Sequence, residues 1–88
     1  MNIAFHPAFQ KAYKKRIASN PKLVRKTKER IELFRQNPRL PLLKDHTLLG
    51  TRLGYRAFSV TGDIRILYED VNVETVRFLD IGTHNQVY

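Results

Sequence analysis

Four side chains in the second half of the sequence have the chemistry to act on a phosphate backbone. They are His46, Arg65, His84 and Tyr88. Histidine titrates near neutral pH and can transfer protons, and the planar arginine fork matches two phosphate oxygens. A base, an acid and a cation are the parts needed to cleave RNA by attack of its own 2′-hydroxyl. Because an aromatic ring can stack on an unpaired base, we treat the four as a candidate site that needs neither a metal nor a protein nucleophile.

Three of these residues also have an ordinary structural explanation. A loop histidine such as His46 is often a surface or capping residue, and His84, at a strand end, can stabilise a turn. A residue at a chain end, such as Tyr88, is often frayed. His6, which precedes a proline at a predicted helix start, is interpreted as structural only. The sequence leaves both interpretations open for His46, His84 and Tyr88.

Arg65 stands out because it interrupts an apolar strand. Residues 54–60 and 64–69 read as two strands joined by a turn at 61–63, and a one-residue slip in their pairing would invert a whole face. A three-residue turn gathers four apolar side chains on one face: Phe58, Val60, Ile64 and Ile66. Arg65 then points to the opposite face, which it shares with Tyr55, Ala57 and Ser59. The competing role for Arg65 is an ion pair with a nearby acid, namely Asp63, Glu69 or Asp80.

The other elements predict an α+β fold of the order β-α-α-β-β-β. Asn2–Phe5 alternates like a short strand, and Pro7 suits the first turn of a helix. Asn20 and Pro21 are typical of a helix cap and a first helical position, so a second helix, Pro21–Gln36, is expected to begin there. The two apolar helix stripes are Phe9, Tyr13 and Ile17, and then Leu23, Thr27, Ile31 and Phe34. We expect a basic antiparallel helical hairpin to cover one face of a small, mainly antiparallel sheet.

The rest of the chain is predicted to hold fewer regular elements. Residues 39–52 read as irregular, 70–72 as a turn, 73–81 as the last strand and 83–88 as a polar tail. The sequence has no repeat, no glycine-rich phosphate loop and no metal-ligand spacing. We therefore expect a single domain over residues 1–88, with neither a metal nor a cofactor.

The net charge of +8 lies in the first half of the chain. Residues 1–44 hold twelve Lys and Arg against Glu29 and Glu32, a net +10, whereas residues 45–88 carry a net −2. Such a field favours an anionic partner, and the alternative is a solvated helix face that aids solubility. The chain has no cysteine, no signal-peptide pattern and no apolar run near the roughly 20 residues of a membrane span. We expect a soluble cytoplasmic protein.

Three stretches resemble the RelE/ParE superfamily of bacterial toxins, and most closely its YafQ and RelE/StbE-type mRNA interferases. They are the pattern Lys44-Asp45-His46-x-Leu48-x-Gly50, residues 54–68, and the pattern Ile81-Gly82-Thr83-His84-x-x-Val87-Tyr88. The first half of the chain matches only in layout, a strand followed by basic helices. The resemblance implies a RelE-like fold and a toxin of a type II toxin–antitoxin module.

The resemblance also implies an activity and its partners. Such toxins enter the ribosomal A site and, without a metal, cut mRNA there by 2′-hydroxyl attack, which inhibits translation. The implied partners are an acidic antitoxin encoded in the same operon, mRNA and ribosomal RNA on the ribosome, and operator DNA bound only through the toxin–antitoxin complex. No membrane partner is implied.

By position, the resemblance assigns roles to individual residues. His84 is implied as the base, and His46 as the acid or a phosphate contact. Asp63 is implied to orient a histidine, Arg65 to stabilise the transition state, and Tyr88 to be the family's C-terminal aromatic. The residues implied to face RNA are Lys11, Lys14, Lys15, Lys22, Arg25, Lys26, Lys44 and Arg56.

Two positions depart from the family pattern. Ser59 stands where YafQ-like proteins have a histidine, and Asp80 stands where many members have a second arginine. An acid at that position reverses the local charge and would weaken phosphate binding. The alternatives are therefore a ParE-like toxin that inhibits DNA gyrase, or a catalytically weak RelE-like antitoxin or RNA-binding partner.

Overall fold

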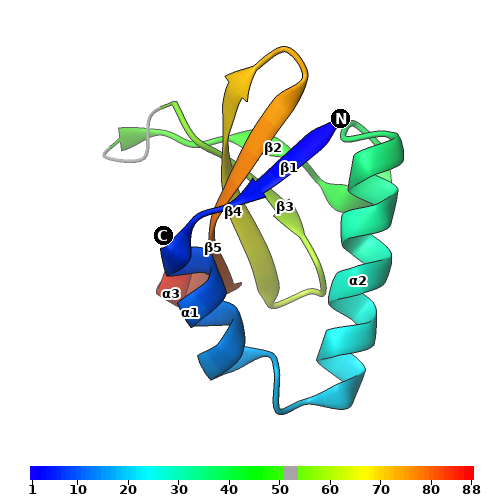
Figure 1. Cartoon of the computed structure of the whole chain (residues 1–88), viewed down its shortest axis with the longest axis vertical. Coiled ribbons are helices and arrows are strands. Elements are labelled where there is room, and N and C mark those ends of the chain that lie inside the picture. Colours follow the sequence, from blue (N-terminus) through cyan, green and yellow to red (C-terminus); the bar gives the residue numbers. More distant parts are fainter. Residues whose placement is uncertain (51–53) are drawn as a thin grey trace.

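The computed structural model describes residues 1–50 and 54–88, which form a sheet with two long helices on one face (Figure 1). The elements in chain order are β1 (Asn2–Phe5), α1 (Pro7–Arg16), α2 (Pro21–Gln36), the short 3-10 helix η1 (Pro41–Leu43), β2 (His46–Thr47), β3 (Arg56–Ser59), β4 (Ile64–Asn72), β5 (Thr75–Thr83) and α3 (His84–Val87). The predicted α+β fold is confirmed. Residues 51–53 of the segment predicted as irregular lie outside the described residues.

The described strands form one sheet in the order β1-β5-β4-β3-β2. β1 runs parallel to β5, and every other neighbouring pair is antiparallel. This confirms the mainly antiparallel sheet. β4 and β5 continue past the other strands as a long two-stranded arm (Figure 1).

Both long helices begin where the sequence predicts, because a side chain caps each one. The His6 Nδ1 atom accepts a hydrogen bond from the Ala8 amide at 2.9 Å, which confirms a structural role for His6. The Asn20 side chain accepts from two amides of the first turn of α2, at 3.1 and 3.2 Å. In each helix a proline occupies the first turn, where its missing N–H is not needed.

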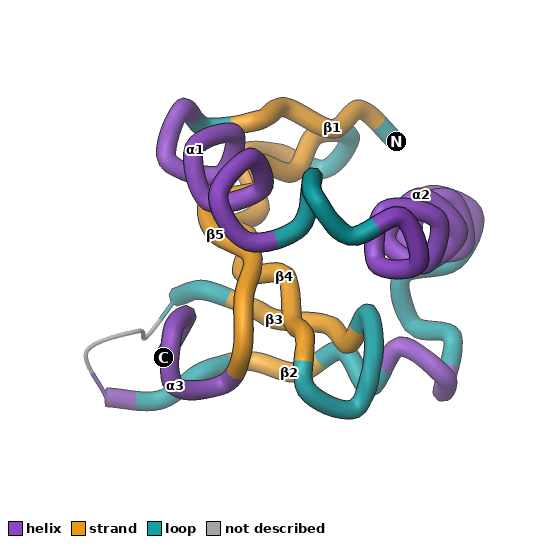
Figure 2. Tube along the Cα trace, turned by 90° about the horizontal axis from the view of Figure 1, so that it is seen from below, coloured by secondary structure: helices purple, strands orange, loops and turns teal. Residues whose placement is uncertain are grey.

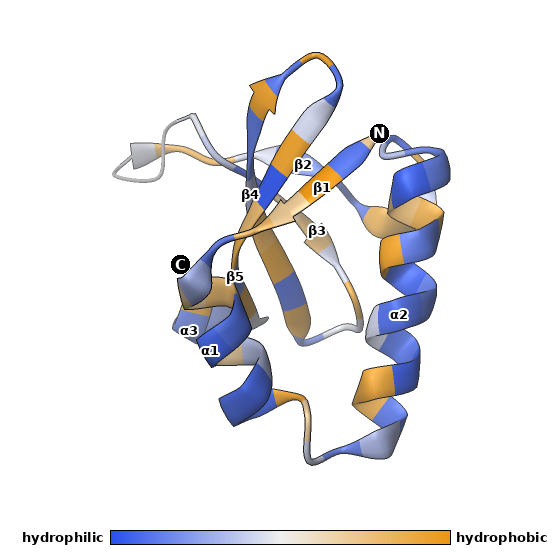
Figure 3. Cartoon of the chain, viewed as in Figure 1, coloured by the Kyte–Doolittle hydropathy of each residue, from blue (hydrophilic) through white to orange (hydrophobic). Residues whose placement is uncertain are grey.

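The core lies between the helices and one face of the sheet. Phe34 of α2 stacks on Phe58 of β3 with ring centroids 4.3 Å apart, and Phe9 of α1 meets Phe78 of β5 at 5.5 Å. The β3–β4 register pairs Phe58 with Ile66, so the predicted three-residue turn and core face are confirmed. The visible surface of both helices is largely hydrophilic (Figure 3), as one apolar stripe per helix requires.

The two long helices run antiparallel, as expected of a helical hairpin, and each packs on the same face of the sheet with a hollow between them (Figure 1). In Figure 2 α1 and α2 lie apart, joined by the short loop between them. A hollow of about 240 Å³ separates them, lined by Phe5, Phe9, Tyr13, Thr27, Lys28 and Ile31. Aromatic side chains from β1 and α1 contact Phe78 of β5, and Phe34 of α2 contacts Phe78 as well, so the sheet holds both helices.

The β4–β5 turn lies further along the chain than predicted. Residues 70–72 still belong to β4, and the turn falls at residues 73 and 74, where the Asn72 side chain accepts from the Glu74 amide at 2.9 Å. The register also shifts at Leu67/Tyr68 and again at Asp70/Asn72. The end of β4 is exposed on both faces, and its polar composition therefore resembles that of a turn.

The predicted polar tail is instead a strand end followed by one helical turn, α3. The Thr83 amide donates to the Gln86 side chain at 2.8 Å, which completes a capping box. Val87 is fully buried and fixes this turn against the protein. None of the helices in the described part of the chain is long and apolar enough to cross a membrane.

Candidate active site

Two predicted site histidines meet the ring of Tyr88. The Tyr88 hydroxyl lies 3.4 Å from the His46 Nε2 atom, and the His84 ring meets the Tyr88 ring edge to face, with centroids 4.4 Å apart. Tyr88 also packs on a small apolar cluster of Leu48, Ala57 and Leu67 on the sheet face opposite the helices. Tyr88 is thus held by packing and is not frayed.

The surroundings of His46 define its proton positions. His46 begins the edge strand β2, within the segment predicted as irregular. Its Nδ1 atom lies 2.9 Å from the carbonyl oxygen of Lys44, and a carbonyl can only accept, so Nδ1 carries a proton. Lys44 adopts a left-handed conformation with φ 52°. The other ring nitrogen, Nε2, consequently faces Tyr88 and is the atom available for proton transfer.

Arg65 lies on the same open face, beside Tyr88. It pairs with Ser59 on β3 and donates to the Ser59 hydroxyl at 2.9 Å. On its other side its partner on β5 is Gly82, which has no side chain to cover it. Burial raises the pKa of the Tyr88 phenol, and the positive charge of Arg65 opposes that rise. The four predicted residues are therefore brought together.

The predicted competing role of Arg65, an ion pair, is not observed. Within residues 1–50 and 54–88, Arg65 makes no ion pair with an acid. Glu69 pairs with Arg77 at 3.6 Å, and Asp80 pairs with Arg16 at 3.1 Å. The guanidinium charge of Arg65 is therefore available to an anion.

Asp80, the departure from the family pattern, is compensated by a helix residue. The Arg16 side chain reaches from the end of α1 to Asp80 and to the Ile81 carbonyl, the latter at 2.9 Å. The pairing of β4 and β5 skips Leu79, and this bulge lets Leu79 and Asp80 both line a hollow of about 450 Å³ beside α1. Because Arg16 neutralises its carboxylate, Asp80 lowers the positive charge of the site less than an unpaired acid at this position would.

A buried carboxylate, which sequence reasoning missed, fixes the segment before His46. The Asp45 side chain is 2% exposed and accepts from Arg56 at 2.8 Å, from Arg39 at 3.0 Å, and from the Tyr68 hydroxyl. We call Asp45, Arg39, Arg56 and Tyr68 the Asp45 cluster. Burial and Asp45 raise the pKa of Tyr68. The Arg56 side chain, predicted to face RNA, is 18% exposed and donates to Asp45 and Tyr68, so its role toward RNA stays a prediction.

Asp63 is not brought to a histidine. It lies exposed in the β3–β4 turn, where its amide donates to the Thr61 hydroxyl at 3.2 Å. In the part of the chain that the structure describes, its carboxylate makes no hydrogen bond or ion pair. The orienting role implied for Asp63 therefore stays a prediction.

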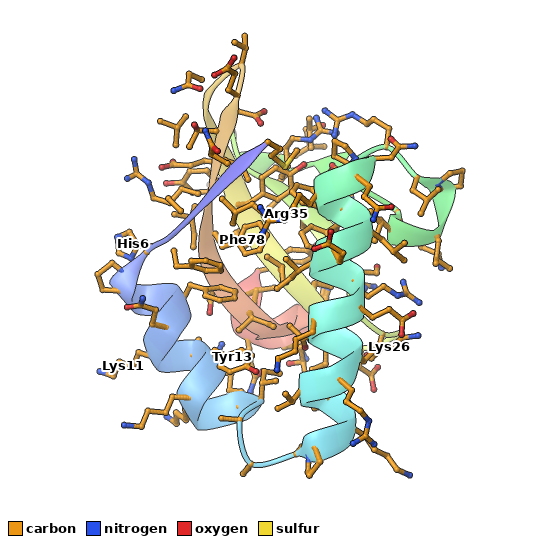
Figure 4. The ribbon with its side chains drawn as sticks, turned by 45° about the vertical axis from the view of Figure 1, so that its right-hand side comes forward. His6, Lys11, Tyr13, Lys26, Arg35 and Phe78 are labelled. Atoms are coloured by element: carbon orange, nitrogen blue, oxygen red, sulfur yellow. The ribbon has the colours of Figure 1, made fainter. Side chains whose placement is uncertain are left out.

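Apart from Arg56 on β3, the predicted basic residues lie on the helices and on the segment before His46. Lys11 and Lys26 point outward from α1 and α2 in Figure 4, and Lys26 lies 3.8 Å from Glu29. The exposed members of the set are Lys11, Lys14, Lys15, Lys22, Arg25 and Lys44. Lys11 and Lys15 border the same hollow as Tyr55 and Leu67, so α1 adds positive charge to the open face. Among the described residues, no group of three or more His, Cys, Asp or Glu is placed to hold a metal ion.

The sequence profile of one family, described as a bacterial toxin of type II toxin–antitoxin system, YafQ, matches residues 1–88. The chain belongs to the YafQ toxin family. The crystal structure of Escherichia coli YafQ is similar at 27% identity and a TM-score of 0.80, covering 99% of this chain and 97% of that one. The YafQ fold thus extends over nearly the whole of both chains.

Other solved structures agree. Escherichia coli YafQ in complex with DinJ matches at 27% identity and a TM-score of 0.79, covering 99% of this chain and 97% of that one. A YoeB/ParE toxin from Agrobacterium tumefaciens matches at 19% identity and a TM-score of 0.78, covering 96% of this chain and 99% of that one, and it supports the fold alone. A comparison with curated protein sequences found no significant match.

Proposed function

We propose that this YafQ-family toxin is an endoribonuclease that cuts mRNA in the ribosomal A site and so stops translation. The observation that carries the proposal is the convergence of His46, His84 and Tyr88 on one face, beside an arginine that has no carboxylate partner among the described residues. The chemistry is attack of the 2′-hydroxyl on the adjacent phosphorus. The 5′-oxygen leaves, and a 2′,3′-cyclic phosphate remains.

Each group has a distinct role in this proposal. His84 removes the 2′-hydroxyl proton, and His46 donates a proton from Nε2 to the leaving 5′-oxygen. The Lys44 carbonyl at Nδ1 holds the His46 ring so that Nε2 faces Tyr88 and the open side of the site. Arg65 stabilises the negative charge that develops on the phosphate oxygens, and the Tyr88 ring stacks on a base next to the cut. No metal takes part in any of these steps.

The test is induction of the toxin in bacteria, with cuts mapped by primer extension and protein synthesis followed by label incorporation. Loss of a general acid or base lowers the rate about 100- to 10,000-fold, so His84→Ala and His46→Ala should each abolish codon-phased cuts. His6→Asn is the matched control, because it removes a histidine outside the site and keeps a capping acceptor. Full cleavage by His84→Ala, or absence of cuts by the wild type while a known nuclease cuts, would refute the proposal.

We also propose that an acidic antitoxin from the same operon neutralises this toxin in the cytoplasm. The net charge of +8 and the complex of Escherichia coli YafQ with DinJ support such a partner. The toxin would then reach operator DNA only within that complex. Co-expression with the neighbouring acidic reading frame should restore growth and yield a stable complex, and continued growth arrest would contradict the pairing.

A further inference from the structure

A second hollow adjoins the candidate site on the side of α2. It measures about 170 Å³ and lies between α2, the segment that follows η1 and the β3–β4 turn. Its lining residues are Arg30, Leu42, Lys44, Ser59, Thr61, Gly62 and Arg65. Three of these are cations and none is an acid, so the hollow is strongly electropositive.

Arg30 is the unusual member of this lining. It lies on α2 facing the sheet and is only 9% exposed. Its Nη1 atom donates to the carbonyls of Leu42 and Ser59 at long distances of 3.4 and 3.5 Å. Its Nε atom is buried and has no hydrogen-bond partner among the described residues. A buried cation without a carboxylate or a full set of acceptors is costly, so Arg30 lacks an anion that would complete its surroundings.

The dimensions and chemistry of the hollow fit a phosphate group. Its volume equals that of five to six liquid waters at roughly 30 Å³ each, which suffices for the five heavy atoms of a phosphate. Guanidinium groups bind phosphate through paired N–H donors, and a lysine adds a mobile positive charge. Lys44 is exposed at the rim, where it can follow a flexible chain.

We infer that this hollow binds a backbone phosphate of the RNA, next to the phosphate that is cut. The inference rests on the proposed function, because Arg65 lines the hollow and also lies beside Tyr88 of the candidate site. In this arrangement one phosphate contacts Arg30 and Lys44 inside the hollow. The next phosphate, which is the one that is cut, lies on the other side of Arg65, at the candidate site. The hollow thereby fixes the register of the strand relative to His46 and His84.

The test measures binding apart from cleavage. A short single-stranded RNA carrying 2′-O-methyl groups cannot react, so its affinity for the purified toxin can be followed by fluorescence anisotropy over a range of salt concentrations. Arg30→Met keeps the bulk of the side chain and removes the charge. We expect about tenfold weaker binding, as for a lost charge-assisted hydrogen bond, and a salt slope smaller by about 0.7.

Matched variants complete the experiment. Arg35→Met removes a cation from the exposed side of the same helix and should leave affinity and slope unchanged. Lys44→Gln changes an exposed side chain and should lower the salt slope of RNA binding as Arg30→Met does. This second variant keeps the inference testable if Arg30→Met does not fold. Wild-type affinity and slope in both Arg30→Met and Lys44→Gln would overturn the inference.

Two further outcomes separate the sources of the signal. Inorganic phosphate that shifts the Arg30 side-chain NMR signals, with no effect of Arg30→Met on RNA affinity, would mean a free-anion site and would also overturn the inference. A weakened RNA complex in Arg30→Met, together with a wild type that cuts no mRNA, would support the hollow and refute only the nuclease proposal.

Discussion

Replacing Asp45 by asparagine tests whether the Asp45 cluster holds the chain in place before His46. The Asp45 carboxylate is almost completely buried and takes donors from two arginines and a tyrosine. Asp45→Asn keeps the shape and one acceptor oxygen. It removes the negative charge and turns an N–H₂ group toward the donors.

The expected loss in the free energy of unfolding depends on how exposed each partner of Asp45 is. Removing one member of a buried ion pair costs about 3–5 kcal/mol, but Arg39 is 58% exposed and can turn to water. The lower value, about 3 kcal/mol, is therefore expected for Asp45→Asn. Tyr68→Phe loses one hydrogen bond to a charged group, about 1.5 kcal/mol, and Arg39→Gln should lose under about 1 kcal/mol. Since a chain of this size is stable by about 4–13 kcal/mol, Asp45→Asn is a severe change.

The assay is urea unfolding followed by far-UV circular dichroism, with the slope m checked for constancy across the three variants. The order of destabilisation should be Asp45→Asn, then Tyr68→Phe, then Arg39→Gln. If Asp45→Asn and Arg39→Gln destabilise equally, the carboxylate does not act as the buried centre of the cluster. In that case the local account of how His46 is positioned is wrong.

Three further predictions concern the same region. Because the pKa of Tyr68 is raised in the folded protein, Tyr68 keeps its proton at pH values above 10, where a tyrosine of the unfolded chain loses it. The free energy of unfolding should therefore fall as the pH rises past 10, by up to about 1.4 kcal/mol per pH unit. Urea unfolding of the wild type and Tyr68→Phe at about pH 9 and about pH 11 measures this, and equal losses would exclude Tyr68. Gly82→Ala places a methyl 2.5 and 2.8 Å from two side-chain atoms and should cost about 1–2 kcal/mol in thermal unfolding; the control Gly62→Ala, with open space around it, should be near neutral. Tyr88→Phe keeps the ring and loses the hydroxyl contact with His46, so its cleavage rate should fall by less than about tenfold. The cleavage rate of Tyr88→Ala, which also loses the ring, should fall further. Equal cleavage rates for the two variants would show that the ring does not contribute.

The pairing of β3 with β4 could be predicted from the sequence, because successive side chains of a strand point to opposite faces of the sheet. Only one register of residues 54–69 places Phe58 with Ile66 and keeps Arg65 out of the core, and this is the register observed. The helix starts were equally predictable, because proline and a capping side chain mark them locally. The chemistry of His46, His84 and Tyr88 marks them as candidates in the sequence, but nothing local joins β2 to α3, so their convergence on one site was supported mainly by the family resemblance.

The parts that could not be predicted all depend on partners far apart in the sequence. Arg16 meets Asp80 across 64 positions, and Arg30 reaches Ser59 across 29. Asp45 reads as an ordinary loop acid until Tyr68 and the arginines are folded around it. The helical turn at the chain end also escaped detection, because a stretch this short has little intrinsic helix propensity and forms only once Val87 is buried.

The parallel pairing of β1 with β5 has a consequence for the order in which this protein becomes structured. Asn2 pairs with Thr75, so the earliest strand can join the sheet only after the last strand exists. Contacts of such long sequence separation form late and slow the folding of a domain. During synthesis from the N-terminus, β1 and α1 therefore cannot pack on β5 while α2 and the β3–β4 hairpin are being made. The candidate site, which needs α3 directly after β5, is among the last of these features to form, because a nascent chain can assemble it only after β5 has been synthesised.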